Sequence, residues 1–420
     1  MKENTRLVPS SGRFAWLLAI VAVLGQGSFS AALGQEIDLA SDGSDGALNI
    51  VADTVLDLPP DGVLNLTTLT VAEGVTLSFN RNPLNTPVYL VCSGAVEING
   101  TIDVSGGASS QTSGGAGGPG GFDGGEPGFN DAPPGAGLGP GGGLGGPAGR
   151  AFQNDGNAVG PGAYLNAGTQ SGRSSRKGTP YGSGLLVPLV GGSGGGGTAG
   201  SPGRGGGGGG GAILVGSNVS VHIGENGAVV ARGGADGDED RGISSASFHG
   251  GSGGAIRIVA PVLTGNGRLN VEARTPGTAG DGRIRLDVLD RRNMAIQFEP
   301  IRSVSAGVFL RVFPEPNPEL RLVEVAGTTI PEDQAGPVRI FLPFGSSPER
   351  NVIVQARNFT GIVPVRVRLY PGNGDPVTFD TEIDMSQGNP VRQTVNVVFP
   401  VNVGVTVNAW TRRAEAPAGE

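Results

Sequence analysis

Three carboxylates at alternate positions are the residues of this sequence best suited to binding a metal ion. Asp236, Asp238 and Asp240 lie in the run Asp-Gly-Asp-Glu-Asp, within a glycine-rich stretch. Oxygen ligands on a loop of this kind are what Ca²⁺ prefers in proteins. The run departs from an EF-hand, because Arg241 stands where glycine is required and Ser247 where a bidentate glutamate is required. Calcium is thus the one candidate cofactor, and the sequence favours a solvated acidic loop tip over a Ca²⁺ site.

Few residues could serve as a general acid, base or nucleophile. His222 falls within an expected strand, where alternation turns its side chain outward, and His249 follows Ser247 in a loop. No third group accompanies Ser247 and His249, so this pair does not indicate a hydrolase. Outward charges are also expected on the strands, at Asp103, Arg257, Glu272 and Arg285. They could line a binding face, but stacked strands facing water display such charges in any case.

The N-terminus predicts export. Basic residues precede an apolar run at residues 14–24, and small residues follow it, so we expect a signal peptide at residues 1–34 and a mature chain that begins at Gln35. The apolar run is shorter than the roughly 20 residues that span a bilayer, and nothing later in the sequence resembles a transmembrane span. A net charge of −8 argues against a nucleic-acid partner. We therefore expect a secreted or cell-surface protein.

The sequence contains a single cysteine, which excludes an internal disulfide. Cys92 follows the apolar run at residues 88–91, and a thiol in that setting is expected to be buried in a core rather than to act as a nucleophile. Packed β-sheet must therefore supply the stability that disulfides supply in many exported domains.

Short β-branched segments separated by glycine or asparagine turns recur along the first 290 residues. The clearest units occupy residues 94–104, 211–232 and 254–273, and a truncated one begins at Gly282. An isolated unit of this kind cannot bury its apolar face, whereas stacked units can. The sequence therefore predicts an all-β protein with a parallel β-solenoid over residues 35–299, capped at its open end by residues 36–60.

Several of these segments carry a resemblance to known proteins: Asp61–Val71, Gly74–Phe79, Thr86–Leu90 and Gly100–Gly107. They resemble a group of exported, glycine-rich bacterial proteins, mostly of unassigned function, over roughly residues 47–290. The resemblance implies a right-handed parallel β-helix. It implies no activity and no set of catalytic residues.

Residues 106–211 contain 43 of the chain's 79 glycines. Such a tract has too few side chains for an ordinary core, and its three-residue period breaks too often for collagen. We expect a flexible insertion that leaves the solenoid at one corner, where a long loop is tolerated. The alternative is a set of polyproline-II segments packed side by side, which glycine would permit through close backbone approach.

The pattern changes after about residue 300. A proline-rich linker is expected at residues 300–318 and an Ig-like β-sandwich at residues 319–412, with Trp410 in its core. Seven alternating strands are expected in the sandwich, at residues 320–325, 338–342, 352–356, 363–370, 377–380, 394–398 and 403–409.

Taken together, these features favour an exported, non-catalytic protein that acts in surface structure, adhesion or matrix binding. Its expected partners are polysaccharides, extracellular matrix or cell-surface components. The alternative is a β-helix protein that binds or degrades polysaccharide. An enzyme should bring carboxylates or a Ca²⁺ site together in one groove, whereas a structural protein should show them scattered.

Overall fold

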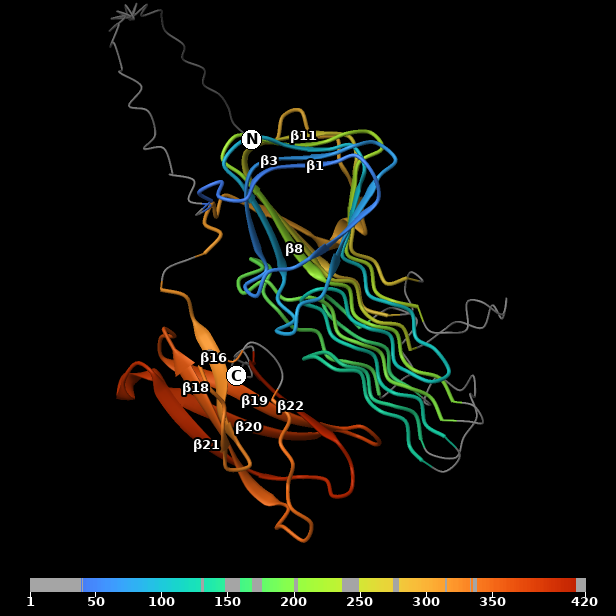
Figure 1. Ribbon diagram of the computed structural model, residues 1–420, viewed down its shortest axis with the longest axis vertical. Helices are drawn as coiled ribbons and strands as arrows, with labels where there is room; N and C mark the ends of the chain where they lie inside the picture. The colour runs from blue at the N-terminus through green and yellow to red at the C-terminus, as the bar shows by residue number, and fades with distance from the viewer. Residues whose placement is uncertain are drawn as a thin grey trace, which may run out of the picture. The chain divides into compact units, whose positions relative to one another are not determined.

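The computed structural model describes residues 39, 41–129, 132–147, 159–167, 176–199, 203–235, 249–274, 279–313, 316–332, 334 and 338–412. This part of the chain has no α-helix, and its regular structure is β-strand together with the short 3₁₀ helices η3 (Ile301–Ser303) and η4 (Met385–Gln387) (Figure 1). The all-β class expected from the sequence is confirmed. The expected signal peptide at residues 1–34 lies outside the described residues.

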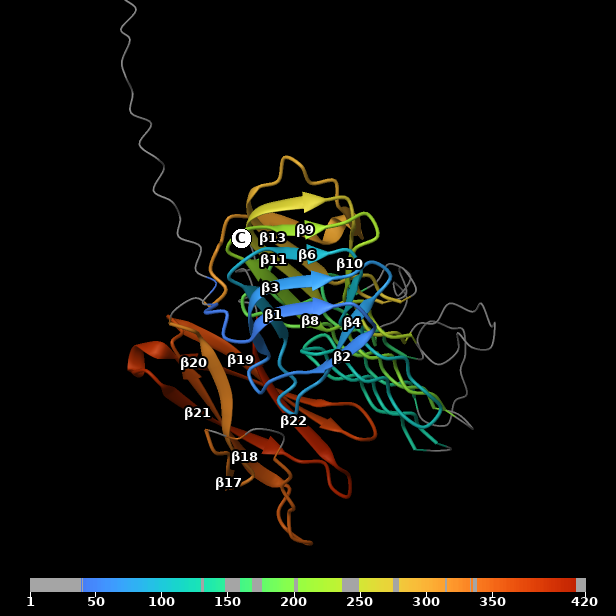
Figure 2. The ribbon, with the colours of Figure 1, turned by 45° about the horizontal axis from the view of Figure 1, so that its top comes forward.

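The first fifteen strands form two parallel sheets (Figure 2). The nine-stranded sheet consists of β1 (Gly46–Ile50), β3 (Val63–Val71), β5 (Val88–Cys92), β6 (Val96–Ile98), β8 (Ala212–Ser217), β9 (Val221–Ile223), β11 (Ala255–Gly265), β13 (Arg283–Asp290) and β15 (Val304–Gly307). The six-stranded sheet consists of β2 (Thr54–Asp57), β4 (Thr76–Asn80), β7 (Thr101–Asp103), β10 (Ala228–Val230), β12 (Arg268–Asn270) and β14 (Gln297–Glu299).

In-register apolar side chains explain why these strands stack. Ile102 of β7 lies opposite Val229 of β10, which in turn lies opposite Leu269 of β12. All three side chains are completely buried. The same apolar cluster takes residues from both parallel sheets, so the two sheets close around one core. Alternation with a period of two along the strand is the sequence pattern that predicted these side chains to be buried.

A right-handed solenoid is not what the structure contains over residues 35–299, and that expectation is corrected. The chain does not wind directly from one repeat to the next at every step. It leaves the sheets after β7 and returns more than a hundred residues later as β8, β9 and β10, which pair with β5, β6 and β7. Strands β3 and β11 are long enough to pair with two strands along the same edge. The first part of β3 pairs with β5 and its last part with β6, and β11 pairs in the same way with β8 and β9. Two parallel sheets around a shared core replace the regular coil.

The nine-stranded sheet continues into the range expected to be a linker. Strand β15 pairs in parallel with β13, and residues 308–313 then cross the outer face of the sheet, where Leu310 and Val312 are buried. Apolar side chains from this segment replace water on that face. Pro314 of the expected linker lies outside the described residues.

The C-terminal region has two antiparallel sheets that share an apolar core. One contains β16 (Glu319–Val325), β17 (Thr328–Thr329), β18 (Glu349–Arg357) and β21 (Val391–Val398). The other contains β19 (Ile362–Pro371), β20 (Val377–Asp384) and β22 (Val405–Thr411). This arrangement is sandwich-like, as the alternating pattern predicted.

Two details of the expected sandwich are wrong. Residues 338–342 form no strand, and Phe341 within them is 88 % exposed. Prolines at positions 337 and 343 flank this run and remove backbone donors that a strand would need. Trp410 is only half-buried and lies under the Arg368 guanidinium, 5.9 Å from its ring centroid, rather than filling the core.

Candidate functional site

The residues proposed to bind Ca²⁺, Asp236, Asp238 and Asp240, all lie outside the described residues. In the ranges that the structure does describe, no group of three or more His, Cys, Asp or Glu side chains could hold a metal ion. The calcium site therefore stays a prediction.

The candidate catalytic side chains are not brought together. His222 lies on the outer side of β9, with Nδ1 2.9 Å from the Thr264 hydroxyl. His249 is completely buried, and its carbonyl oxygen accepts a hydrogen bond from the Gly207 amide at 2.9 Å. Cys92 is buried as expected, and burial raises the pKa of its thiol to about 12. A thiol with that pKa is a poor nucleophile at neutral pH.

Two of the charges expected to face outward belong to a buried ion cluster. Arg257 is 1 % exposed and Asp287 is fully buried, with the Arg257 Nε 3.1 Å from the Asp287 Oδ2. Arg285 donates to the other carboxylate oxygen at 2.9 Å, and Arg257 also donates to the carbonyls of Phe309 and Arg311. Burial lowers the pKa of Arg257, partly offset by Asp287.

This cluster fastens residues 308–313 to the sheet, so it serves the fold rather than a substrate. Asp287 was not among the charges expected to face outward. The available signal was the alternation of Arg285 and Asp287 within one strand, followed by a second apolar run at residues 308–313.

A second polar cluster lies where the six-stranded sheet meets the glycine-rich region. Asp281 is 1 % exposed, and its Oδ2 accepts hydrogen bonds from Asn166 at 2.6 Å and from the Arg302 Nε at 2.7 Å. Burial raises the pKa of the nearby Glu272, and the charges of Glu299 and Asp281 add to that increase. A carboxyl group with a raised pKa is suited to donate a proton, so Glu272 is the candidate acid that this shift indicates among the described residues. Asp103, by contrast, only accepts a hydrogen bond from the Ser105 amide.

The glycine-rich region forms an ordered bundle of extended segments. In its two central segments, every residue of 191–199 and of 205–211 is buried. Segment 191–199 exchanges backbone hydrogen bonds with segments 121–128, 135–139, 141–146, 159–163, 203–211 and 249–254. Segment 203–211 does the same with segments 106–110, 113–118, 121–128, 191–199, 231–235 and 249–254. Each central segment is therefore surrounded by backbone partners on all sides.

The hydrogen bonds of the bundle advance in steps of three residues. The amides of Gly115 and Gly118 donate to the carbonyls of Gly206 and Gly209, and those of Phe122, Gly125 and Gly128 donate to Gly192, Gly195 and Thr198. A polyproline-II helix has three residues per turn and no internal hydrogen bonds, so its amides are free to bond to neighbours at this interval. The expectation of a flexible insertion is wrong for the described residues, and the packed alternative is the one that the structure contains.

Many interior positions of this bundle can be occupied only by glycine. A Cβ atom built on Gly206 would lie 2.0 Å from the carbonyl oxygen of Gly195, and one on Gly195 would lie 2.0 Å from the carbonyl oxygen of His249. Both distances are far inside van der Waals contact. Glycine is used here for close backbone approach and not for flexibility.

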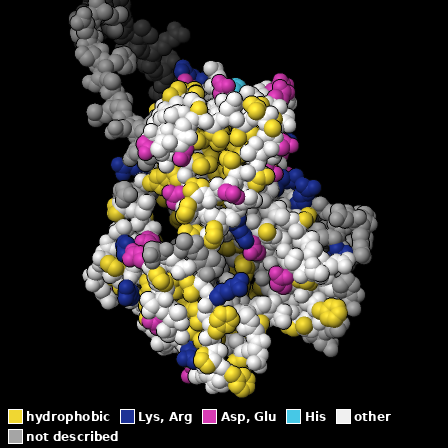
Figure 3. All heavy atoms as spheres, in the orientation of Figure 1, with side chains coloured by type: hydrophobic (Ala, Val, Ile, Leu, Met, Phe, Trp, Pro, Cys, Tyr) yellow, Lys and Arg dark blue, Asp and Glu magenta, His cyan; other side chains and the backbone are white. Residues whose placement is uncertain are grey.

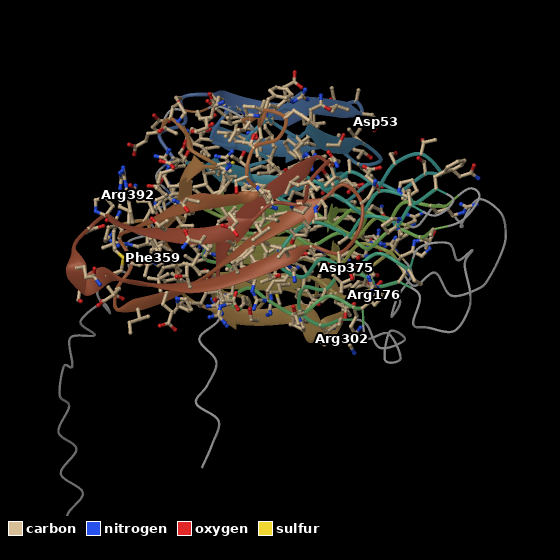
Figure 4. The ribbon with its side chains drawn as sticks, turned by 90° about the horizontal axis from the view of Figure 1, so that it is seen from below. Asp53, Arg176, Arg302, Phe359, Asp375 and Arg392 are labelled. Carbon is tan, nitrogen blue, oxygen red and sulfur yellow. The ribbon has the colours of Figure 1, made fainter. Side chains whose placement is uncertain are left out.

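One edge of the bundle is covered by the sandwich-like region. The Tyr370 hydroxyl donates to the Gly139 carbonyl at 2.7 Å, and the Gly374 amide donates to the Pro134 carbonyl at 3.2 Å. Arg176 and Asp375 form an ion pair at this edge (Figure 4). Elsewhere the bundle presents small side chains, backbone and an occasional larger residue such as Phe129, which is 61 % exposed.

Charged side chains are scattered over the visible face of the molecule rather than gathered into one patch (Figure 3). No helix in the described part of the chain is long and apolar enough to cross a membrane. No protein-family model, curated protein or solved structure matches this chain.

Proposed function

We propose that this is an exported, non-catalytic protein that binds an extracellular polysaccharide, matrix or cell-surface component through the glycine bundle. The observation that supports this most directly is the backbone hydrogen bonding around segments 191–199 and 203–211. Ordering a glycine costs about 1–2 kcal/mol of backbone entropy and buries no side chain in return. A chain that orders so many of them gains a rigid surface, which is of use to a binding protein.

The ionisable groups support a non-catalytic role. The two carboxylates that are most deeply buried, Asp281 and Asp287, each pair with arginine. Burial raises the pKa of Cys92, so this thiol is not activated as a nucleophile. In the same proposal, the paired antiparallel sheets are an Ig-like module, and the chain is related to the exported glycine-rich bacterial proteins that it resembles.

A binding experiment tests this function. The purified chain is mixed with a panel of insoluble polysaccharides and immobilised matrix proteins, and both the retained protein and the released sugar are measured. We expect retention on at least one surface with no sugar released. Phe129→Ala, on the bundle, should weaken retention, whereas Phe341→Ala, which removes an 88 % exposed ring from the sandwich-like region, should not. Absence of retention on every surface would contradict the proposal.

Glu272 supports one alternative function, a polysaccharide-degrading enzyme. Its raised pKa and its neighbours Glu299 and Asp281 resemble the carboxyl groups that glycosidases use in pairs. Under this alternative, sugar is released from one of the polysaccharides, with a rate that falls as pH rises through the Glu272 pKa. Glu272→Gln would then abolish release without preventing binding. Release that persists in this variant would remove Glu272 from consideration.

A further inference from the structure

The two parallel sheets end in open strand edges. The six-stranded sheet has β14 at one edge and β2 at the other. No described strand pairs with the outer side of β14 or of β2. Strand β1 likewise pairs only with β3, and β15 only with β13. An unpaired edge offers a row of backbone donors and acceptors to another strand. Since all pairs in these sheets are parallel, β2 and β14 are edges to which a further parallel strand can be added.

The apolar core is also incompletely covered at both ends of the stack. Most of its side chains are fully buried, but a few from the first and last strands remain partly exposed: Leu48, Leu56, Met294, Phe298 and Val304. Larger apolar exposures lie beside them. Val51 is 70 % exposed next to β1, and Ile301 is 72 % exposed next to β14. Each end therefore presents an apolar surface bordered by an open strand edge.

The two ends carry opposite charges. Residues 41–57, which include β1 and β2, contain four aspartates and no basic residue. Residues 291–302, which include β14, contain three arginines and one glutamate. Asp53 and Arg302 lie at opposite ends of the stacked strands (Figure 4). The first-strand end is acidic. At the last-strand end Arg292 pairs with Asp290 and Arg302 pairs with the buried Asp281, so Arg291 is the arginine of this segment that lies outside these ion pairs. The last-strand end is therefore weakly basic, and the unlike ends of two molecules attract each other.

We infer that the occupant of each end is a second copy of this chain, joined head to tail. Strand β14 of one copy pairs in parallel with β2 of the next, which continues the six-stranded sheet across the junction at the usual strand spacing of about 4.8 Å. Leu56 and Phe298 then cover each other's exposed sides, and the acidic end meets the basic end. A head-to-tail contact of this kind joins two unlike surfaces and leaves one of each free. Repeating the contact therefore gives a linear assembly of many molecules.

The alternative pairing of two identical ends is disfavoured by the same features. A two-fold axis at β2 would make the new strand pair antiparallel and would place Asp53 and Asp57 of one copy near the same aspartates of the other. Both residues are exposed. The charges therefore select the head-to-tail arrangement.

Two single substitutions test this inference because each blocks one end only. Ile301→Glu places a carboxylate where the acidic end of the next copy must dock, and Val51→Glu places one on the apolar part of the acidic end. Both side chains are at least 70 % exposed, so the fold should tolerate the changes. Ile362→Glu, at a 63 % exposed position of the sandwich-like region, is the matched control. Each full-length chain is studied by sedimentation velocity over a range of concentrations at low and high salt.

The unaltered chain and Ile362→Glu should form dimers and longer species as concentration rises, and salt should weaken this association. Ile301→Glu and Val51→Glu should each raise the dissociation constant at least about tenfold. An equimolar mixture of the two should restore dimers and stop there, because it contains one intact acidic end and one intact basic end. An unaltered chain that sediments as a monomer at every concentration would overturn the inference. So would a mixture that stays monomeric while the unaltered chain associates.

Discussion

Adding one methyl group inside the glycine bundle should destabilise the protein strongly. In Gly206→Ala the new Cβ lies 2.0 Å from the carbonyl oxygen of Gly195, 2.4 Å from its carbonyl carbon and 2.6 Å from the carbonyl oxygen of Gly196. All three neighbours are backbone atoms of another central segment, so no side chain can rotate away. Relief requires that two hydrogen-bonded segments separate. Overpacking of a core usually costs 1–3 kcal/mol, and we expect about 3 kcal/mol here.

Gly184→Ala is the matched control for this substitution. A Cβ at Gly184 meets no atom within 4 Å, and its φ angle is not in the left-handed region. Alanine there should leave stability within about 1 kcal/mol, in the stabilising direction. Thermal melting followed by circular dichroism compares the two variants. A loss of 3 kcal/mol corresponds to roughly 6–12 °C in melting temperature for a domain of this kind. Equal melting temperatures for Gly206→Ala, Gly184→Ala and the unaltered chain would refute the packed bundle.

Three further results are expected. Asp287→Asn leaves the Arg257 and Arg285 guanidinium groups without their buried counter-charge. It should therefore lower the free energy of unfolding, measured by denaturant titration, by about 3–5 kcal/mol. An unchanged midpoint would show that the cluster does not fasten residues 308–313. Because burial raises the Cys92 pKa to about 12, the folded protein should not react with a thiol reagent at pH 8, whereas the unfolded protein should react fully; rapid reaction of the folded protein would place this thiol at the surface. If the acidic run is a solvated loop tip, millimolar Ca²⁺ should leave the melting temperature unchanged, and a rise that Asp238→Ala abolishes would establish a calcium site instead.

Period-two alternation allowed the sequence to predict most strands. Ile98 and Ile102, for example, alternate with polar residues, and the structure buries both. The continuous solenoid was wrong, since alternation identifies which face of a strand is inside but not which strand is its neighbour. Strand β5 pairs with β8 across more than a hundred residues, and no local pattern encodes that pairing.

The order of the glycine bundle could not be predicted with the same tools. Glycine has no side chain, so the sequence shows no apolar face, and flexibility is the ordinary expectation for such a tract. Its order rests on backbone bonds between distant segments, such as the one from the Gly206 amide to the Gly125 carbonyl. The three-residue glycine period was the one available signal.

The candidate site was predicted only in part. Alternation correctly placed Arg257 and Arg285 on the outer side of the sheet. It could not show that residues 308–313 cover them, because that contact joins segments about fifty residues apart. Glu272 was expected as one outward charge among several, and only the fold brings Asp281 and Glu299 close enough to raise its pKa.

Hydrogen–deuterium exchange on the glycine-rich segments tests the central claim most directly. Nearly all amides in residues 191–199 and 205–211 donate to backbone carbonyls of neighbouring segments and are shielded from water. We predict that peptides covering these residues exchange as slowly as peptides from the parallel strands, for example those covering β8, over hours. Exchange of the glycine peptides within seconds, while β8 stays protected, would show a flexible insertion and contradict the rigid surface on which the proposed binding function depends.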